Sequence, residues 1–224
     1  MTKNILVLDV GGTHVKMHMR GQRSRKFVSG PTLTAQQMVA TVQSLSRGWR
    51  YEVVSMGYPG VVLHGKPVVE PHNLGQGWVG FAYRSAFGKP VRIINDAALQ
   101  AIGSYKGGRM LFLGLGTGLG SALIVDGVIA PTELAHLPYK HGRTFEEYVG
   151  ERGRKRLRAK KWRMAVADVV KRLSAALEAD DVVIGGGNAC RLHKLPANAR
   201  RVTNSNAFTG GVRLWQMPGR DLAK

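Results

Sequence analysis

The chain has 224 residues, of which 44% are apolar, so it can bury a full hydrophobic core as one large or two small domains. Its single cysteine, Cys190, excludes a disulfide framework and a cysteine-based zinc cluster, and favours a reducing compartment. No run of about 18 apolar residues occurs, and Asp9 interrupts the first apolar stretch, so we expect a cytoplasmic protein without a membrane span or signal peptide.

The formal charge is +19, from 33 Lys and Arg against 14 Asp and Glu. An excess of this size raises the concentration of anionic partners around the molecule. Nucleic acid, an acidic membrane and inorganic polyphosphate all fit this balance. The simpler interpretation is that the charge only keeps the protein soluble.

A first glycine turn, Gly11-Gly12-Thr13, lies between strand-like residues 5–8 and 15–19. A second turn, Gly116-Thr117-Gly118, lies between apolar residues 110–113 and 122–125, which indicate buried strands.

Without side chains in the way, successive amides of such turns can converge on an anion, and the hydroxyls of Thr117 and Ser121 are further candidate donors. Either turn alone is most often structural. As a pair, with Asn95 and Asp96 between them in sequence, they suggest one polyanion held by two lobes.

Between the two turns, residues 34–45 have helical spacing and residues 53–57 indicate a buried strand. Residues 71–78 then form a polar loop too long for a tight turn, and such loops often face a site. Asn73 in this loop has an amide suited to sugar hydroxyls, although a turn Asn also commonly bonds its own backbone.

Residues 91–94 form a short buried strand that ends in Asn95 and Asp96, directly before a helical stretch, residues 97–105. Ligands bind at the ends of strands in open α/β sheets. An Asp before a helix is a favoured N-cap, and we expect Asp96 in that role. A carboxylate here can also accept the proton of a hydroxyl that attacks a phosphoryl group, and the two roles are compatible.

Glu133 and His136 are three residues apart and share one face of a helical turn. Such a histidine is more often structural than a ligand, and the spacing alone does not make a zinc site. The pattern of residues 144–178 predicts a helix with a break, and a third glycine turn, residues 185–187, precedes another expected helix. Eight cationic residues lie between positions 152 and 163, a run that most often forms a solvated face.

Jointly, these motifs resemble those of bacterial glucokinases of the ROK family, in particular the polyphosphate-dependent branch. The matching segments are residues 9–16, 57–60, 73–80, 95–97, 115–122, 133–137 and 185–187, in the family's order. The cysteine-rich zinc motif of many ROK kinases has no counterpart here.

The resemblance implies an α/β, two-lobed actin/hexokinase-like fold built from ribonuclease-H-like lobes around a central cleft. It places residues 1–96 and 207–224 in a small lobe and residues 97–206 in a large lobe. It further implies a cytoplasmic homodimer that uses glucose and polyphosphate or ATP as substrates.

The resemblance also assigns site residues. The sugar-binding set is Asn73, Asn95, Asp96, Glu133 and His136, with Asp96 as catalytic base. The phosphate-binding set is Asp9, Gly11, Gly12, Thr13, Lys16, Gly116, Thr117 and Gly118, with Gly185, Gly186 and Gly187 near the nucleotide or phosphate chain. A further sugar-binding Glu of the family corresponds to Glu146 or Glu147.

The expected reaction is phosphoryl transfer to the 6-hydroxyl of glucose, with Mg²⁺ held directly or through water by Asp9. One alternative is an ATP-dependent kinase of glucose or a related hexose. Another is a non-catalytic kinase fold that binds polyanions or nucleic acid. Only eight residues precede Asp9, so we do not expect the DNA-binding module of ROK repressors.

Overall fold

The structure, a computed structural model, describes residues 3–217. The chain divides into two compact units, one formed by Met1–Leu99 with Ala207–Lys224 and the other by Gln100–Asn206. Residues 1–2 and 218–224, which the expected small lobe includes, lie outside the described part of the chain. Among the described residues, none of the helices combines the length and the apolar character that crossing a membrane requires.

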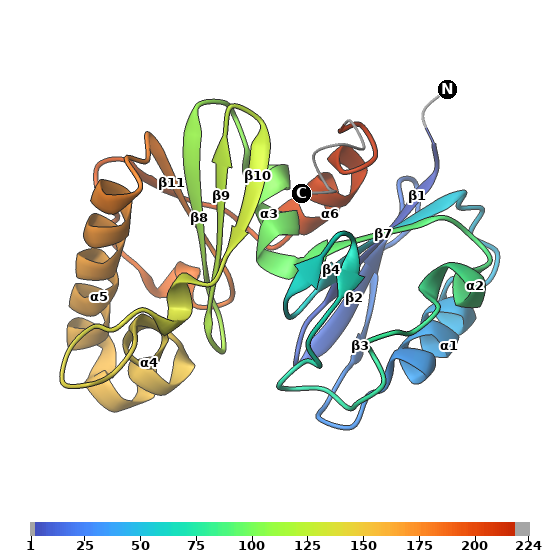
Figure 1. Ribbon diagram of the computed structural model, residues 1–224, viewed down its shortest axis with the longest axis horizontal. Coiled ribbons are helices and arrows are strands. Elements are labelled where there is room, and N and C mark those ends of the chain that lie inside the picture. Colours follow the sequence, from blue (N-terminus) through green and yellow to red (C-terminus); the bar gives the residue numbers. More distant parts are fainter. Residues whose placement is uncertain (1–2, 218–224) are drawn as a thin grey trace. The chain divides into compact units, whose positions relative to one another are not determined.

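The first unit is built on a five-stranded sheet with the strand order β3-β2-β1-β4-β7 (Figure 1). Its first three strands are antiparallel, whereas β4 and β7 run parallel to β1. Its elements in chain order are β1 (Ile5–Val10), β2 (His14–His18), β3 (Arg25–Val28), α1 (Ala35–Leu45), β4 (Val53–Tyr58), β5 (Val62–Leu63), β6 (Lys66–Pro67), α2 (Tyr83–Phe87), β7 (Val91–Asn95), α3 (Asp96–Ser104), which runs on into the second unit, and α6 (Asn206–Arg213).

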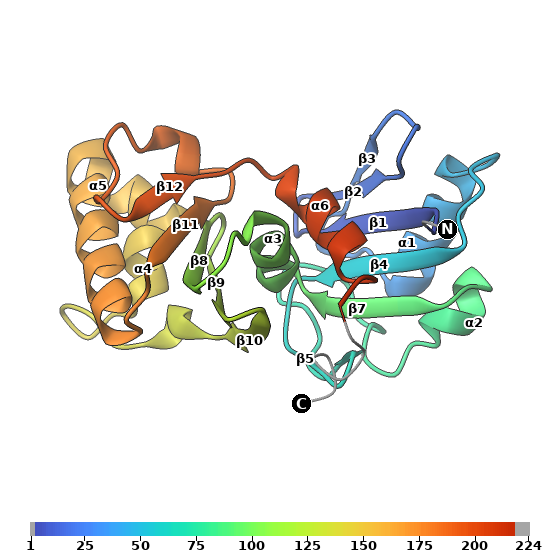
Figure 2. The same ribbon diagram turned by 90° about the horizontal axis from the view of Figure 1, so that it is seen from above.

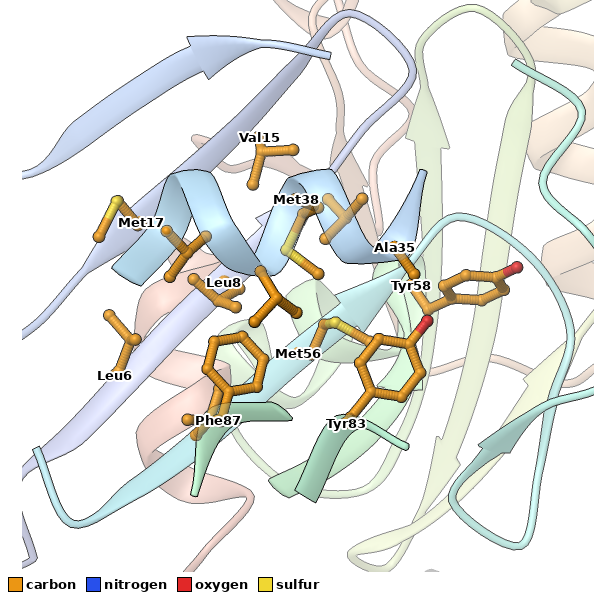
Figure 3. Packing of buried hydrophobic residues seen from close by; sticks show 14 of the residues in the cluster. Leu6, Leu8, Val15, Met17, Ala35, Met38, Met56, Tyr58, Tyr83 and Phe87 are labelled. Carbon is orange, nitrogen blue, oxygen red and sulfur yellow. The ribbon is translucent and has the colours of Figure 1, made fainter. Parts of the chain in front are cut away.

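Helices cover both faces of this sheet. Because alternate residues of β1 point to opposite sides, the strand has side chains packed on both faces. Leu6 and Leu8 pack with Met38 of α1 and Phe87 of α2 in one core (Figure 3). Val7 points to the other face, where α6 crosses the sheet (Figure 2). All six residues of β1 are consequently buried.

The predicted helix over residues 34–45 is confirmed. Thr34 is its N-cap, and Thr34 and Gln37 form a reciprocal capping box. Met38 and Val42, one turn apart, are fully buried on the face that meets the sheet.

The second unit repeats the strand order of the first, as β10-β9-β8-β11-β12. Three antiparallel strands again lie beside two strands that run parallel to the first of them. Its elements are β8 (Arg109–Leu115), β9 (Leu119–Val125), β10 (Val128–Thr132), the 3₁₀ turn η1 (Leu134–His136), α4 (Phe145–Val149), α5 (Glu151–Ala176), β11 (Asp181–Gly185), the 3₁₀ turn η2 (Ala189–Arg191) and β12 (Ala199–Arg201). Each of the two predicted glycine turns therefore joins the first two strands of its own sheet.

Helices α4 and α5 cover one face of the second sheet in both views (Figures 1 and 2). Val166, Val169 and Leu173 of α5 pack there against Leu113 and Ile184. The predicted break in the helix over residues 144–178 lies at Gly150, between α4 and α5. A second interruption occurs at Arg158, whose backbone is not helical.

The prediction of a helix after the third glycine turn is wrong. The chain forms only the three-residue η2 there and then continues to β12. The amides of Arg191 and Leu192 donate to the carbonyls three residues before them, which is the 3₁₀ pattern. Such helices are usually short, and this one ends after a single turn.

Close packing between α6 and β1 gives a stability prediction. A methyl group at Gly211 would collide with the side chain of Val7, so Gly211→Ala should lower the free energy of unfolding by about 1 to 3 kcal/mol. Val212→Ala, on the exposed side of the same helix, should change it by less than about 0.5 kcal/mol. Urea unfolding measures both, and equal effects would contradict this packing.

Candidate functional site

The first glycine turn presents two unsatisfied amides. The Gly11 amide donates to the His14 carbonyl (3.1 Å), and the Gly11 carbonyl accepts from the Ser29 hydroxyl (2.7 Å). Among residues 3–217, the amides of Gly12 and Thr13 have no hydrogen-bond acceptor. Of the three predicted phosphate-binding amides, the turn itself uses that of Gly11.

Asp9 and Lys16 lie opposite each other on β1 and β2, directly below this turn. The carboxylate of Asp9 is buried and its Oδ2 lies 3.0 Å from Nζ of Lys16, whose side chain is about one third exposed. Asn73 also reaches the turn, since a Cβ on Gly12 would lie only 2.8 Å from that of Asn73. One end of the first sheet thus brings together an ion pair, two amide donors and a side-chain amide.

Asp96 lies beside this group because β1, β4 and β7 are parallel and their carboxyl ends meet at one edge. Asp9 pairs with Gly57 across the ladder. A Cβ on Gly57 would lie 3.3 Å from Cα of Asp96 and 2.9 Å from Leu99, so this glycine lets α3 approach the sheet closely. Asp96 therefore lies against Gly57 of β4, the strand between β1, which carries Asp9, and β7.

The helix cap is Asn95, which corrects the expectation that Asp96 caps the helix. Oδ1 of Asn95 accepts from the Ala98 amide three residues later (3.1 Å), the pattern of an N-cap. Its Nδ2 donates to the Gly60 carbonyl (3.1 Å), which leaves one N–H of the predicted sugar-binding amide for other partners. Asp96 is the first residue of α3, and its Oδ1 accepts from Ala97 (2.8 Å).

The second glycine turn repeats the pattern of the first. The Gly116 amide donates to the Gly118 carbonyl (3.1 Å), so the turn uses this predicted donor internally. The amides of Thr117 and Gly118 have no acceptor within the described chain. Each turn therefore leaves two consecutive N–H groups unsatisfied, the arrangement that binds anions.

Glu146 lies directly over the second turn and Glu147 does not. The Glu146 Oε2 accepts from the Leu119 amide (3.1 Å), and a side chain at Gly118 would collide with this carboxylate. Glu147 instead completes the capping box of α4 with Thr144. Of the two candidates that the sequence leaves open, only Glu146 lies at the turn.

The third glycine turn, residues 185–187, packs against the second. Gly186 has φ of 84°, and a side chain there would collide with the backbone of Leu115. Asn188 fixes the contact, because its amide donates to the Leu115 carbonyl (2.9 Å) and its Nδ2 donates to Gly116 (3.1 Å) and Glu151 (3.1 Å). Sequence reasoning assigned no role to Asn188, although its position directly after three glycines was a signal.

Ser121 holds the segment with Glu133 and is not a donor to an anion, which corrects that expectation. Its hydroxyl is buried, donates to the Thr132 carbonyl (2.9 Å) and accepts from the Leu134 amide (3.2 Å). Glu133 directly precedes η1, and His136 ends it. Both side chains are exposed and have no hydrogen-bond partner within residues 3–217.

The model of the ROK family matches residues 5–132, which is more than half of the chain. This chain belongs to the ROK family. A curated relative, the polyphosphate glucokinase of Mycobacterium tuberculosis, is 29% identical to this ROK protein, with 80% of this chain and 76% of the relative covered.

Solved structures of other ROK proteins have the same fold. The inorganic polyphosphate/ATP-glucomannokinase of Arthrobacter sp. strain KM superposes with a TM-score of 0.81 at 22% identity, covering 96% of this chain and all of the other. A ROK family glucokinase of Streptomyces griseus, in complex with glucose and AMPPNP, gives 0.71 at 15% identity, covering 94% and 98%. The expected fold class, the two-lobed α/β fold of ROK sugar kinases, is confirmed.

The cap assignment in this ROK protein can be tested by stability. Asn95→Ala removes the cap of α3 and the bond to Gly60, and should lower the free energy of unfolding by about 1 to 2 kcal/mol. Asp96→Asn keeps Oδ1 and should cost less than half as much. Chemical denaturation compares the two, and a larger loss for Asp96→Asn would return the cap to Asp96.

Proposed function

We propose that this protein transfers the terminal phosphoryl group of inorganic polyphosphate or ATP to the 6-hydroxyl of glucose. The observation that carries the proposal is that Asp96, which lies against Gly57 of β4, is at the same end of the sheet as Asp9 and the Gly12 and Thr13 amides. The names of the M. tuberculosis and Arthrobacter relatives support the same reaction and the same donors.

Asp96 is the general base in this proposal. Its carboxylate accepts the proton of the attacking hydroxyl as the bond to phosphorus forms. Asn95 performs the structural work of the cap, so removing the charge of Asp96 need not disturb the helix. The base is thereby held on a rigid element, as positioning of a reacting group requires.

Each unit, taken by itself, carries residues that we propose as sugar contacts. In the first unit they are Asn73 and the remaining N–H of Asn95. In the second unit they are Glu133, His136 and Glu146. Amides, carboxylates and an imidazole supply the donors and acceptors that sugar hydroxyls need. Glu133 and His136 have no protein partner among the described residues, which agrees with a role toward a ligand.

The donor is held by the backbone. In the first unit the Gly12 and Thr13 amides, and in the second unit the Thr117 and Gly118 amides, are the proposed donors to phosphate oxygens. Such donors stabilise the charge that develops on a phosphoryl group during transfer. Lys16 adds a positive charge at the first turn.

Kinases of this type use phosphoryl donors that generally need a divalent metal, and we propose Mg²⁺. No cluster of three or more metal-ligating side chains occurs among the described residues, so a cage of protein ligands is not present there. Asp9 fits the other mode of binding, in which Mg²⁺ keeps several waters and is held by one carboxylate and the substrate's phosphates. Asp9 would hold the ion, which neutralises phosphate charge when bound.

A panel of donors and sugars tests the function. Purified protein is assayed with long-chain polyphosphate and with ATP as separate donors, and with glucose, mannose and other hexoses as acceptors. We expect glucose 6-phosphate from at least one donor. Absence of turnover with every pair, together with salt-sensitive binding of duplex DNA, would favour the non-catalytic alternative. A cytoplasmic location and a homodimer belong to the same proposal.

The base assignment predicts a specific kinetic loss. Asp96→Asn should reduce kcat by roughly 10² to 10⁴ because the proton acceptor is gone, while folding changes little. Steady-state assays give kcat, and thermal unfolding is the control. A kcat within about threefold of wild type would show that another group takes the proton.

Glucose binding predicts a thermal shift. Glucose at about 100 times its Kd should stabilise the folded state by about 2.7 kcal/mol and raise Tm by about 5 to 10 °C. Asn73→Ala and Glu133→Ala should reduce this shift, and an equal concentration of sorbitol controls for co-solvent effects. Full shifts in both variants would remove these residues from the sugar site.

A further inference from the structure

A basic pocket of about 400 Å³ lies in the second unit, between the interruption of α5 and the segment that contains η2. Six of its lining residues carry basic groups: Arg154, Lys155, Arg158, Arg163, Arg191 and His193. Trp162 also lines it, fully buried and fixed by a bond from its Nε1 to the Val149 carbonyl (2.8 Å). We name this feature the α5 pocket.

The positive charge of the α5 pocket is largely uncompensated. Glu151 pairs with Arg154 (2.5 Å) and lies 3.8 Å from Lys155. Arg158, Arg163 and Arg191 have no carboxylate partner within residues 3–217. Three guanidinium groups are thus left to meet an anion, and guanidinium forks bind phosphate oxygens in pairs.

The backbone conformation of Arg158, beside the pocket, is strained. This residue has φ of 62° and ψ of 168°, a combination that side chains rarely adopt. The interruption separates Arg154 and Lys155 on one side from Trp162 and Arg163 on the other. A regular helix would avoid this strain, so the surroundings must hold the interrupted form.

A chain of hydrogen bonds connects the α5 pocket to the second glycine turn. Asn188 donates to both the Gly116 carbonyl and Glu151, and Glu151 accepts from Arg154 at the pocket wall. Bonds from Arg154 and Asn188 lower the pKa of Glu151 to about 2, so it stays ionised at neutral pH. Only two side chains therefore separate the turn from the pocket wall.

The other cationic residues among positions 152–163 do not line the α5 pocket. Arg156 donates to the Glu147 carbonyl (2.7 Å) and stacks on Tyr148. Arg152, Lys160 and Lys161 do not line the pocket. The run is consequently not one uniform face, and position relative to the interruption decides which charges enter the pocket.

We propose that the α5 pocket binds phosphates of an inorganic polyphosphate chain beyond those held at the second glycine turn. This inference rests on the proposed function. The polar side chains of the lining are almost all hydrogen-bond donors, because it contains no Asn, Gln, Ser, Thr, Asp or Glu and only His193 can accept a bond, which suits phosphate oxygens better than the mixed edge of a nucleotide base. A polyphosphate chain carries about one negative charge per phosphate along its whole length, which matches a pocket of unpaired arginines.

Two triple variants with the same change in charge test the proposal. The pocket variant is Arg158→Gln, Arg163→Gln and Arg191→Gln. The control variant is Arg152→Gln, Lys160→Gln and Lys161→Gln. General attraction of anions falls equally in both, so only a local site separates them. Arg158→Gly is a further pocket variant that suits the positive φ and guards against misfolding.

The readouts are KM for long-chain polyphosphate, its salt dependence, and KM for ATP. In the pocket variant we expect KM for long chains to rise roughly tenfold or more and the log-log salt slope to flatten by about 2 to 3 units. KM for ATP should stay within about twofold, and the control variant should resemble wild type. Equal effects in both variants, or an equal loss with ATP, would overturn the proposal.

Direct binding separates this proposal from the proposed function. Titration calorimetry with long-chain polyphosphate, without sugar, should show weaker binding to the pocket variant than to the control variant. If no donor supports turnover, the proposed function fails, and this binding difference still decides the pocket. Equal affinities of the two variants would reject the α5 pocket as a polyphosphate site.

Discussion

The unsatisfied N–H pairs of the two glycine turns are the constraint on which the rest of the structure depends. A tight hairpin normally satisfies its amides internally or in water. Here side chains from elsewhere bond to carbonyls of the turns. Ser29 donates to the Gly11 carbonyl of the first turn, and Asn188 donates to the Gly116 carbonyl of the second. Each turn makes one internal bond, from the Gly11 amide or the Gly116 amide, and leaves the next two N–H groups of the chain without an acceptor among residues 3–217. The strands beside them fix these donors in place.

The repeat of one strand order in both units explains why so much of the fold could be predicted. Apolar strands joined by glycines leave few pairings open, and the capping box at Thr34 marks the start of α1 in the sequence itself. The site was harder. Whether Ser121 faces the turn or the neighbouring strand depends on the pairing of β9 with β10, and whether Asn95 or Asp96 caps α3 depends on a single residue of helix phase. Spacing in the sequence determines neither.

Some of the many cationic side chains are held by partners in the protein, and others are left to meet an anion. Arg154 and Arg200 are held by carboxylates, and Arg156 by a carbonyl and an aromatic ring. The sequence shows only that positions 152–163 are basic. The non-helical backbone at Arg158, which no local pattern announces, determines which of them line the α5 pocket. Charge without such a constraint gives attraction but no binding geometry.

The return of the chain to the first unit affects the order in which the protein can fold during synthesis. The second unit is one continuous segment, Gln100–Asn206, and is complete once that segment has left the ribosome. The first sheet still lacks α6 at that moment, so Val7 and the buried Ser55, which donates to the Gly211 carbonyl (2.6 Å), remain uncovered. The first unit must therefore wait for residues 206–213 to be translated, with an apolar sheet face exposed to chaperones in the meantime.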